Sequence, residues 1–276
     1  MNQPDNEMMN EPGRRLPNKS MNSMSKQPIY VAFSTQKGGV GKSAFTVLAA
    51  SYLHYLKDYR VAVLDCDFPQ HSLFEMRKRD SELILQNESY KRQAYEQFTR
   101  LGRKAYPVVK CRVEEALQKA EELTGNTEEQ PDILFFDLPG TVNSTGVLKV
   151  IAAMDYIFSP VSADRMILKS TLSFMDITNR MLIGTAGCRI KGLYLYWNLV
   201  DGREKSDLYA TYEKVIAEMK LNLLRTFIPD TKRFRKELSE NGQAAFRSTM
   251  FPADKRLLKG SHLEELLEEI VNIINR

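Results

Sequence analysis

The stretch IYVAFSTQKGGVGKS, residues 29–43, decides the fold of this 276-residue chain. Its first six residues form an apolar run rich in β-branched and aromatic side chains, which predicts a buried strand. A glycine-rich turn follows, and the apolar pattern of residues 44–56 then predicts a helix. A strand, a glycine-rich loop and a helix in this order form the first unit of a parallel α/β sheet.

The glycine-rich turn has the composition of a phosphate-binding loop. Its glycines allow the backbone to approach a polyphosphate with its N–H groups pointing inward, and the N-terminus of the following helix adds partial positive charge. Lys42 would reach the outer phosphates, and the Ser43 hydroxyl would be a ligand of Mg²⁺. We therefore expect ATP and Mg²⁺ as cofactors, with nucleotide contacts from Gly38, Gly39, Val40, Gly41, Lys42, Ser43 and Ala44.

The loop differs from the general phosphate-binding pattern at its beginning. Gln36 stands where that pattern has its first glycine, and a second lysine, Lys37, opens the loop. The sequence K-G-G-V-G-K-S resembles the deviant Walker A motif of the ParA/MinD family of ATPases. The resemblance implies that the ATP-bound form is a homodimer, in which Lys37 reaches the partner's nucleotide and acts in catalysis together with Lys42.

Two further segments place carboxylates at the ends of predicted strands. Residues 61–70, VAVLDCDFPQ, resemble the D-x-D-P-Q stretch of the family, and residues 132–140, DILFFDLPG, resemble its Walker B strand. Carboxylates at the carboxyl ends of parallel strands face the crevice where such sheets bind ligands. The resemblance implies that Asp137 holds a water of the Mg²⁺ shell and that Asp67 orients the attacking water, while a helix-capping role stays open for either aspartate.

Asp65 is expected to be structural. A one-residue insertion next to Asp67 affects what can be expected of that second aspartate. Phe68 is an extra residue between Asp67 and Pro69, which puts the geometry of Asp67, and with it the rate of hydrolysis, in question. The form D-C-D-F-P-Q-H-S, followed by a long basic helix, looks most like the ParA relatives, often called TraA, of conjugative-transfer regions.

Two weaker motifs lie in the second half. Asn198, at the end of a strand predicted over residues 190–199, matches a family asparagine that hydrogen-bonds adenine, and Pro229 lies in a segment, 227–230, that looks like the family's I-P segment beside the base. An asparagine at a strand end is by default a turn residue, so the role of Asn198 stays open.

The fold class follows from near-continuous apolar strands that alternate with helices. Such a pattern predicts a doubly wound, mostly parallel sheet with helices on both faces. We expect a flexible tail over residues 1–27 and one ATPase domain over residues 28–276. Residues 70–123 predict a helical insertion after the second strand, broken near Tyr106–Pro107, and residues 261–274 predict a C-terminal helix. The strands that follow the first are expected at residues 60–66, 133–136, 155–160, 190–199 and 225–228.

The net charge of +4 is unevenly distributed. Residues 77–112 contain ten Lys/Arg against four Asp/Glu, and residues 225–259 contain nine against four. Family members bind DNA without sequence preference through basic residues in their C-terminal third, which implies DNA contacts, away from the nucleotide face, for Lys232, Arg233, Arg235 and Lys236. A solvated face is the alternative, and a second basic surface in the insertion consists of Lys78, Arg79, Lys91, Arg92, Arg100, Arg103 and Lys104.

Composition excludes several classes of protein. No run reaches 18 apolar residues, and residues 1–27 lack the apolar core of a secretory signal, which disfavours membrane spanning and export. The three cysteines contain no C-x-x-C pair, which argues against a disulfide framework or a zinc site. We expect a cytoplasmic, nucleoid-associated protein, in which the isolated histidines His54, His71 and His262 are structural.

These observations favour one function and leave two alternatives. The leading hypothesis is a Mg²⁺-dependent ATPase that dimerises on ATP, binds double-stranded DNA and serves partition or conjugative transfer, with a stimulating partner of ParB type. A MinD-like ATPase at the membrane surface is disfavoured because the last helix carries four glutamates where a lipid-binding helix has basic residues. The other alternative is a scaffold that binds ATP without turnover.

Overall fold

The computed structural model describes residues 27–125, 130–140, 145–203 and 206–276, so the predicted tail lies outside the described residues apart from Gln27. A seven-stranded parallel sheet has the order β3-β2-β4-β1-β5-β6-β7. Its strands are β1 Ile29–Phe33, β2 Val61–Asp65, β3 Val108–Lys110, β4 Ile133–Asp137, β5 Tyr156–Val161, β6 Gly192–Trp197 and β7 Asn222–Leu223.

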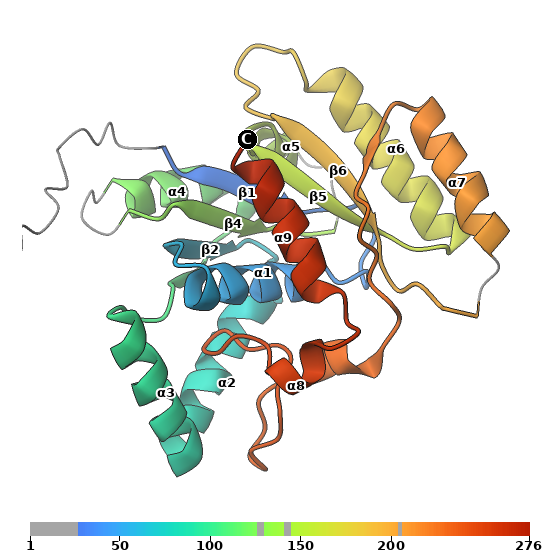
Figure 1. Ribbon diagram of the computed structural model, residues 1–276. Helices are drawn as coiled ribbons and strands as arrows, with labels where there is room; N and C mark the ends of the chain where they lie inside the picture. The colour runs from blue at the N-terminus through green and yellow to red at the C-terminus, as the bar shows by residue number, and fades with distance from the viewer. Residues whose placement is uncertain (1–26, 126–129, 141–144, 204–205) are drawn as a thin grey trace, which may run out of the picture.

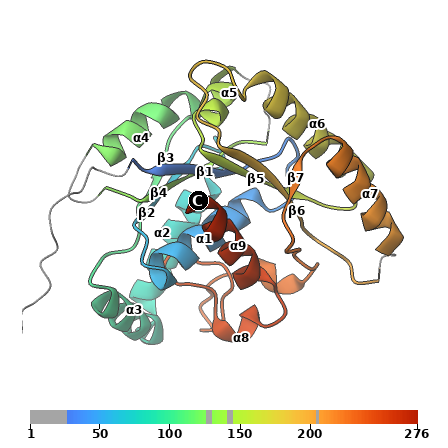
Figure 2. The ribbon, with the colours of Figure 1, turned by 45° about the horizontal axis from the view of Figure 1, so that its top comes forward.

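Helices cover both faces of this sheet, which confirms the predicted fold class (Figure 2). One face carries α1 Lys42–Leu56, α9 Leu263–Ile274 and the start of α2 Ser72–Gln86. The other face carries α4 Ala116–Thr124, α5 Thr145–Ala152, α6 Arg165–Met181 and α7 Ser206–Glu218. The predicted C-terminal helix is thus confirmed as α9.

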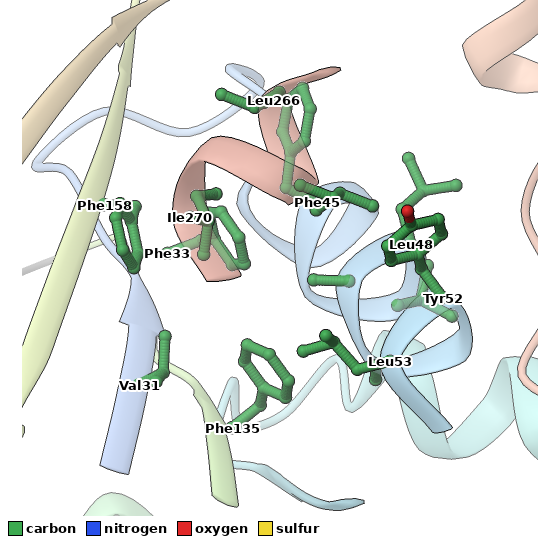
Figure 3. Close-up of a cluster of buried hydrophobic side chains, with 14 of the residues drawn as sticks. Val31, Phe33, Phe45, Leu48, Tyr52, Leu53, Phe135, Phe158, Leu266 and Ile270 are labelled. Carbon is green, nitrogen blue, oxygen red and sulfur yellow. The ribbon is translucent and has the colours of Figure 1, made fainter. Parts of the chain in front are cut away.

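The core on the α1 face fixes the helix that carries the glycine loop. Side chains of β1, β4 and β5 face α1 and α9 across this core, as Figure 3 shows for Phe33, Phe135 and Phe158 on the strands and Phe45 and Ile270 on the helices. All five are at most 2% exposed. Burying each large side chain contributes roughly 1.5–3 kcal/mol, so the start of α1 is held firmly against the end of β1.

The last predicted strand is wrong in position. Arg225 and Thr226 donate their backbone N–H groups to the Glu269 carboxylate of α9, at 2.9 and 3.0 Å, and not to β6. The sheet therefore ends at the two-residue strand β7, and residues 225–228 continue along β6 as an irregular segment.

The segment from 70 to 123 contains an unpredicted edge strand. Its helices are α2, α3 Glu88–Leu101 and α4, with a short 3₁₀ turn Val113–Glu115 before α4, and β3 pairs with β2 between α3 and that turn. The expected break at Tyr106–Pro107 is confirmed, because these residues lie between α3 and α4, where Pro107 leads into the edge strand, a position that tolerates proline. A second, unpredicted break lies at Asn87, whose side chain accepts hydrogen bonds from Ser89 and Tyr90.

Helices α2 and α3 pack against residues 237–254, and we call these three segments together the annex (Figure 1). Its small apolar cluster includes Ile84, Tyr90 and Phe251. Asp80 of α2 joins the segments, because its Oδ2 accepts hydrogen bonds from the Ser248 hydroxyl and from both the N–H and the hydroxyl of Thr249. The short helix α8 Lys255–Leu258 follows the annex along the chain.

Candidate functional site

The glycine-rich loop connects β1 to α1 at the carboxyl edge of the sheet. Gly39 and Gly41 have φ angles of 79° and 92°, in the left-handed region that favours glycine. Gly41 is the N-cap of α1 and supplies no side-chain acceptor to the helix, while Lys37, Gly38 and Gly39 are exposed. The loop therefore presents backbone N–H groups and one lysine toward solvent, as a phosphate cradle requires.

Lys42 and Gly140 form the inner wall of this cradle. The Lys42 side chain is 9% exposed, and its Nζ donates to the Lys37 carbonyl at 3.2 Å. Burial lowers the pKa of Lys42, although Asp137 and Asp67 act in the opposite direction. A Cβ added at Gly140 would lie 3.2 Å from that Nζ and 3.5 Å from the backbone nitrogen of Gly38, so only a residue without a side chain leaves this space open.

Asp137 ends β4 at the floor of the cradle. It is 0% exposed, and neither of its carboxylate oxygens has a hydrogen-bond partner among the described residues. Burial raises its pKa to about 7; the Ser43 hydroxyl and Lys42 lower it, and the charges of Asp65 and Asp67 raise it further. Burying a carboxylate without hydrogen-bond partners costs free energy. Such an arrangement is expected where the carboxylate binds a cation.

The donor set fits Mg²⁺ through few protein ligands. Magnesium usually keeps several waters and takes one or two protein oxygens plus substrate phosphates. Ser43 and Asp137 offer such oxygens at the cradle. Within the described ranges no group of three or more His, Cys, Asp or Glu residues is arranged to hold a metal ion, so phosphate and water would complete the shell.

Asp65 and Asp67, two residues apart, have different roles. Asp65 Oδ2 accepts hydrogen bonds from the N–H groups of Leu73 and Phe74, both at 2.9 Å, so Asp65 caps α2 and is structural as expected. The Asp67 carboxylate accepts no such bond from any residue that the structure describes. Burial raises its pKa and Lys42 lowers it, which keeps this carboxylate electrostatically coupled to the cradle. Phe68 turns its ring outward, 54% exposed, with the Arg112 guanidinium 4.9 Å from its centre.

The structure brings Asn198 and Pro229 to the same place. Asn198 is 4% exposed and donates from Nδ2 to the Val40 carbonyl at 2.9 Å, a contact with the cradle that the sequence did not indicate. Val200 forms a parallel bridge with Pro229 beside it. Asn198 therefore borders the glycine loop and Pro229 lies beside the residues that follow Asn198, and their roles toward a base stay predictions.

The basic cluster of the C-terminal third lies beside the cradle and not away from it, so that expectation is wrong. It forms a 3₁₀ helix, Lys232–Arg235, whose Phe234 ring lies 5.9 Å from the Phe45 ring at the start of α1. Arg233 is half-buried and donates to the carbonyls of Leu257 and Lys259, which gives it a structural role. The exposed members are Lys232, Arg235 and Lys236.

The basic residues of the insertion divide in a similar way. Arg79 pairs with Glu237, Lys91 with Glu88 and Arg103 with Asp58, so three of the seven have an acidic partner on the protein. The cations of this set that lie exposed and for which no such pair is recorded are Lys78, Arg92, Arg100 and Lys104.

The three histidines are structural in this fold, because a ring nitrogen of each lies within hydrogen-bond distance of a backbone carbonyl. The pairs are His54 with Lys104, His71 with Asp65 and His262 with Phe227. Burial lowers the pKa of His54 to about 4. None of the helices in the described ranges has the length and apolar character needed to span a membrane.

Comparison with known proteins gives a consistent picture. The model of the CobQ/CobB/MinD/ParA nucleotide binding domain matches residues 31–244. No curated protein sequence gives a significant match. Among solved structures, a plasmid partition protein from Borrelia burgdorferi bound to AMPPNP has 18% identity and a TM-score of 0.56, over 89% of this chain and 99% of that one.

Two further neighbours are MinD proteins. The cell division ATPase MinD of Pyrococcus furiosus has 18% identity and a TM-score of 0.54, over 90% of this chain and 100% of that one. MinD of Pyrococcus horikoshii, complexed with Mg-ADP, has 14% identity and a TM-score of 0.55, over 91% and 97%. At these identities the likeness shows the fold. Nothing in these comparisons bears on the closer resemblance to conjugative-transfer relatives, which stays a prediction.

Proposed function

Since the chain belongs to the CobQ/CobB/MinD/ParA nucleotide-binding domain family, we propose that it is a Mg²⁺-dependent ATPase of ParA type, which dimerises on ATP and then binds double-stranded DNA. The observation that carries the proposal is the unpartnered Asp137 carboxylate, buried in the same cradle as Lys42. Ser43 and Asp137 would hold Mg²⁺, which supplies charge neutralisation for the phosphates when it is bound.

The protein's own groups would act through charge and position, as phosphoryl transfer generally requires. Lys42, already beside the floor of the cradle, would bind the outer phosphates. Asp67 would orient the attacking water, since it is half-buried, coupled to Lys42 and not used as a helix cap. Lys37 is exposed at the rim, where a second copy could receive it.

Two substitutions test this assignment. Asp67→Ala should bind ATP and form the dimer but release no phosphate at steady state, because the residue positions water and does not hold the nucleotide. Lys37→Ala should bind ATP as a monomer in size-exclusion chromatography. Turnover at the parent rate in Asp67→Ala would move the water-orienting role elsewhere, and an ATP dimer of unchanged stability in Lys37→Ala would remove the cross-dimer role.

DNA binding is proposed for the exposed cations Lys232, Arg235 and Lys236, which project from the segment beside α1. Several phosphate contacts would give binding that is independent of sequence and sensitive to salt. A dimer doubles such a surface, so affinity should be highest with ATP. Arg233 is left out, because its guanidinium is bonded to backbone carbonyls.

The DNA test uses two variants with the same change in charge. Arg235→Glu with Lys236→Glu should weaken binding to every DNA sequence and flatten the salt dependence by roughly one unit of slope per lost phosphate contact. The control, Lys169→Glu with Lys214→Glu, changes exposed lysines of α6 and α7 and should bind as the parent does. Equal losses in both variants would leave only a general charge effect, and full binding by the first would remove this cluster.

We place the ATPase in partition or conjugative transfer of a mobile element, where a ParB-type protein stimulates turnover. The named role of the Borrelia burgdorferi neighbour and the segment DCDFPQHS, residues 65–72, support this context. Phosphate release should be slow with the protein alone and faster when DNA and a ParB-type protein are added. ATP binding without turnover under every condition would favour the scaffold alternative.

A further inference from the structure

Cys66 and Cys111 lie side by side, directly after the two neighbouring strands β2 and β3. Their Sγ atoms are 3.6 Å apart, and the Cys111 N–H donates to the Asp65 carbonyl at 3.1 Å, which continues the ladder of the two strands. Neighbouring strands run about 4.8 Å apart. This spacing lies inside the Cα separation of roughly 4.4–6.8 Å that a disulfide spans.

Both side chains point into the same apolar core, on the α4 face of the sheet. Cys66 is 1% exposed and Cys111 is 6% exposed, so a small oxidant reaches Cys111 first. The third cysteine, Cys188, lies between α6 and β6, at the opposite part of the sheet order. The chain therefore contains one adjacent thiol pair and one distant thiol that serves as an internal control.

We propose that Cys66 and Cys111 are an oxidisable pair, which a hydroperoxide converts into an intrachain disulfide. The Cys111 sulfur attacks the peroxide, giving a sulfenic acid at Cys111 and releasing the alcohol, or water from hydrogen peroxide. The Cys66 sulfur then displaces hydroxide from that sulfenic acid, and the hydroxide takes the Cys66 thiol proton, so that the S–S bond forms and one water leaves. The pair loses two electrons and two protons, and the O–O bond of the peroxide takes up the two electrons. A dithiol reverses the reaction by thiol exchange.

The position of the pair couples this reaction to the proposed active site. The Cys66 N–H donates to the Asp137 carbonyl at 2.9 Å, and the Cys66 carbonyl accepts from the N–H of Phe68 at 2.9 Å. Asp67 lies between Cys66 and Phe68 in the chain, so a displacement of Cys66 also displaces the Asp67 backbone. Drawing the Cys66 sulfur from 3.6 Å to a bond length of roughly 2.0 Å pulls this segment toward the edge strand. Residues 37–43 are on another strand–helix connection and stay in place.

The expected consequence is slower ATP turnover with nucleotide binding retained, and this part rests on the proposed ATPase function. Asp67 would move relative to Lys42, whereas residues 37–43 of the glycine-rich loop would keep their positions. Oxidised protein should hydrolyse ATP at least threefold more slowly than reduced protein and recover with dithiothreitol.

Peptide mapping of the full-length protein by mass spectrometry tests the chemistry without reference to activity. After hydrogen peroxide and alkylation, the parent and Cys188→Ala should both yield the Cys66–Cys111 cross-linked peptide. Cys66→Ala and Cys111→Ala should not, and either variant that folds is sufficient as the negative control. Free, alkylated Cys66 and Cys111 in the treated parent, or sulfinic acid at Cys111 without the cross-link, would overturn the proposal.

Phosphate release by Cys188→Ala, before and after peroxide, tests the coupling. A reversible loss that is absent from the variant lacking Cys111 supports it, and an unchanged rate in protein shown to be cross-linked overturns it. If the reduced protein releases no phosphate while the cross-link still forms, the thiol pair stands and the ATPase proposal falls, so the two failures are distinguishable.

Discussion

Two buried carboxylates, Asp80 in the annex and Asp137 in the cradle, have the same burial and opposite surroundings. Each is 0% exposed, and burial raises the pKa of each. Oδ2 of Asp80 accepts three hydrogen bonds from Ser248 and Thr249, whereas neither oxygen of Asp137 has a partner among the described residues.

The difference distinguishes Asp80, a carboxylate that stabilises the fold, from Asp137, a carboxylate that we propose binds a ligand. The annex supplies one oxygen of Asp80, Oδ2, with three donors, so this carboxylate is anchored in the free protein, although its Oδ1 has no partner among the described residues. The cradle supplies Asp137 with a lysine, the nearby Ser43 hydroxyl and open space at Gly140, but neither carboxylate oxygen meets a donor in hydrogen-bond geometry among the described residues. Substitutions should therefore act on stability in the annex and on ligand binding in the cradle.

The largest expected effect on ligand binding is the loss of ATP affinity in Lys42→Ala. This change removes a buried cation of the cradle, and a hydrogen bond between charged groups is worth roughly 1.5–3 kcal/mol, so affinity should fall on the order of 100-fold. Isothermal titration calorimetry measures it, with Lys214→Ala on α7 as the matched control. Undiminished affinity in Lys42→Ala would remove the cradle assignment.

The second expected effect is on the stability of the annex. Asp80→Ala leaves three donors of Ser248 and Thr249 without their acceptor, so it should lower the free energy of unfolding by about 3 kcal/mol. Urea unfolding at constant pH measures this loss. Stability equal to that of the parent would mean that Asp80 does not join α2 to residues 248–249.

The third expected effect is an increase in the free energy of unfolding, opposite in sign to the loss expected for Asp80→Ala. The folded pKa of Asp137 is about 7, above its ordinary value of 3.8, so the protonated form stabilises the fold. This stabilisation is complete below about pH 4 and is lost as pH rises toward and through 7. Asp137→Asn imitates the neutral form at every pH. Without Mg²⁺ it should be more stable than the parent at pH 8, on the order of 2–4 kcal/mol.

A pH series of urea unfolding curves checks this sign. The difference between Asp137→Asn and the parent should grow between about pH 4 and pH 7 and level off above it. A variant that is less stable than the parent at pH 8 would show that the ionised Asp137 carboxylate is stabilised within the free protein.

The smallest expected effect is steric. In Gly140→Ala the added Cβ would lie 3.2 Å from Lys42 Nζ, the mobile end of a flexible side chain, so we expect ATP affinity to fall by a few fold with little change in stability. Gly202→Ala, where a Cβ meets nothing within 4 Å, is the control. Equal ATP affinity in both variants would mean that the space beside Gly140 is not used by the nucleotide.

The sequence alone predicted the cradle because its signals are local. The glycines, the two lysines and the carboxylates at strand ends lie within short segments. The chemistry of these segments can be inferred without knowing which distant residues contact them. The parallel fold followed from β1, β2, β4 and β5, whose side chains are all buried and therefore read as continuous apolar runs.

The parts that the sequence did not predict depend on distant residues. Whether residues 225–228 form a strand is decided by Glu269, which takes up two backbone N–H groups. The structural role of Arg233 is decided by carbonyls at residues 257 and 259. Strand β3 is only three residues long and directly follows a proline. Its pairing with β2 is made by backbone hydrogen bonds, so no pattern of side chains predicted it.

The Mg²⁺ dependence of ATP binding in the parent and in Asp137→Asn tests the central contrast most directly. Isothermal titration of ATP is performed at pH 8 with excess Mg²⁺ and again with EDTA. We predict that Mg²⁺ strengthens ATP binding by the parent and has little effect in Asp137→Asn, because the unpartnered carboxylate at the floor of the cradle is the group that we propose holds the ion. The same Mg²⁺ dependence in both proteins would contradict the account.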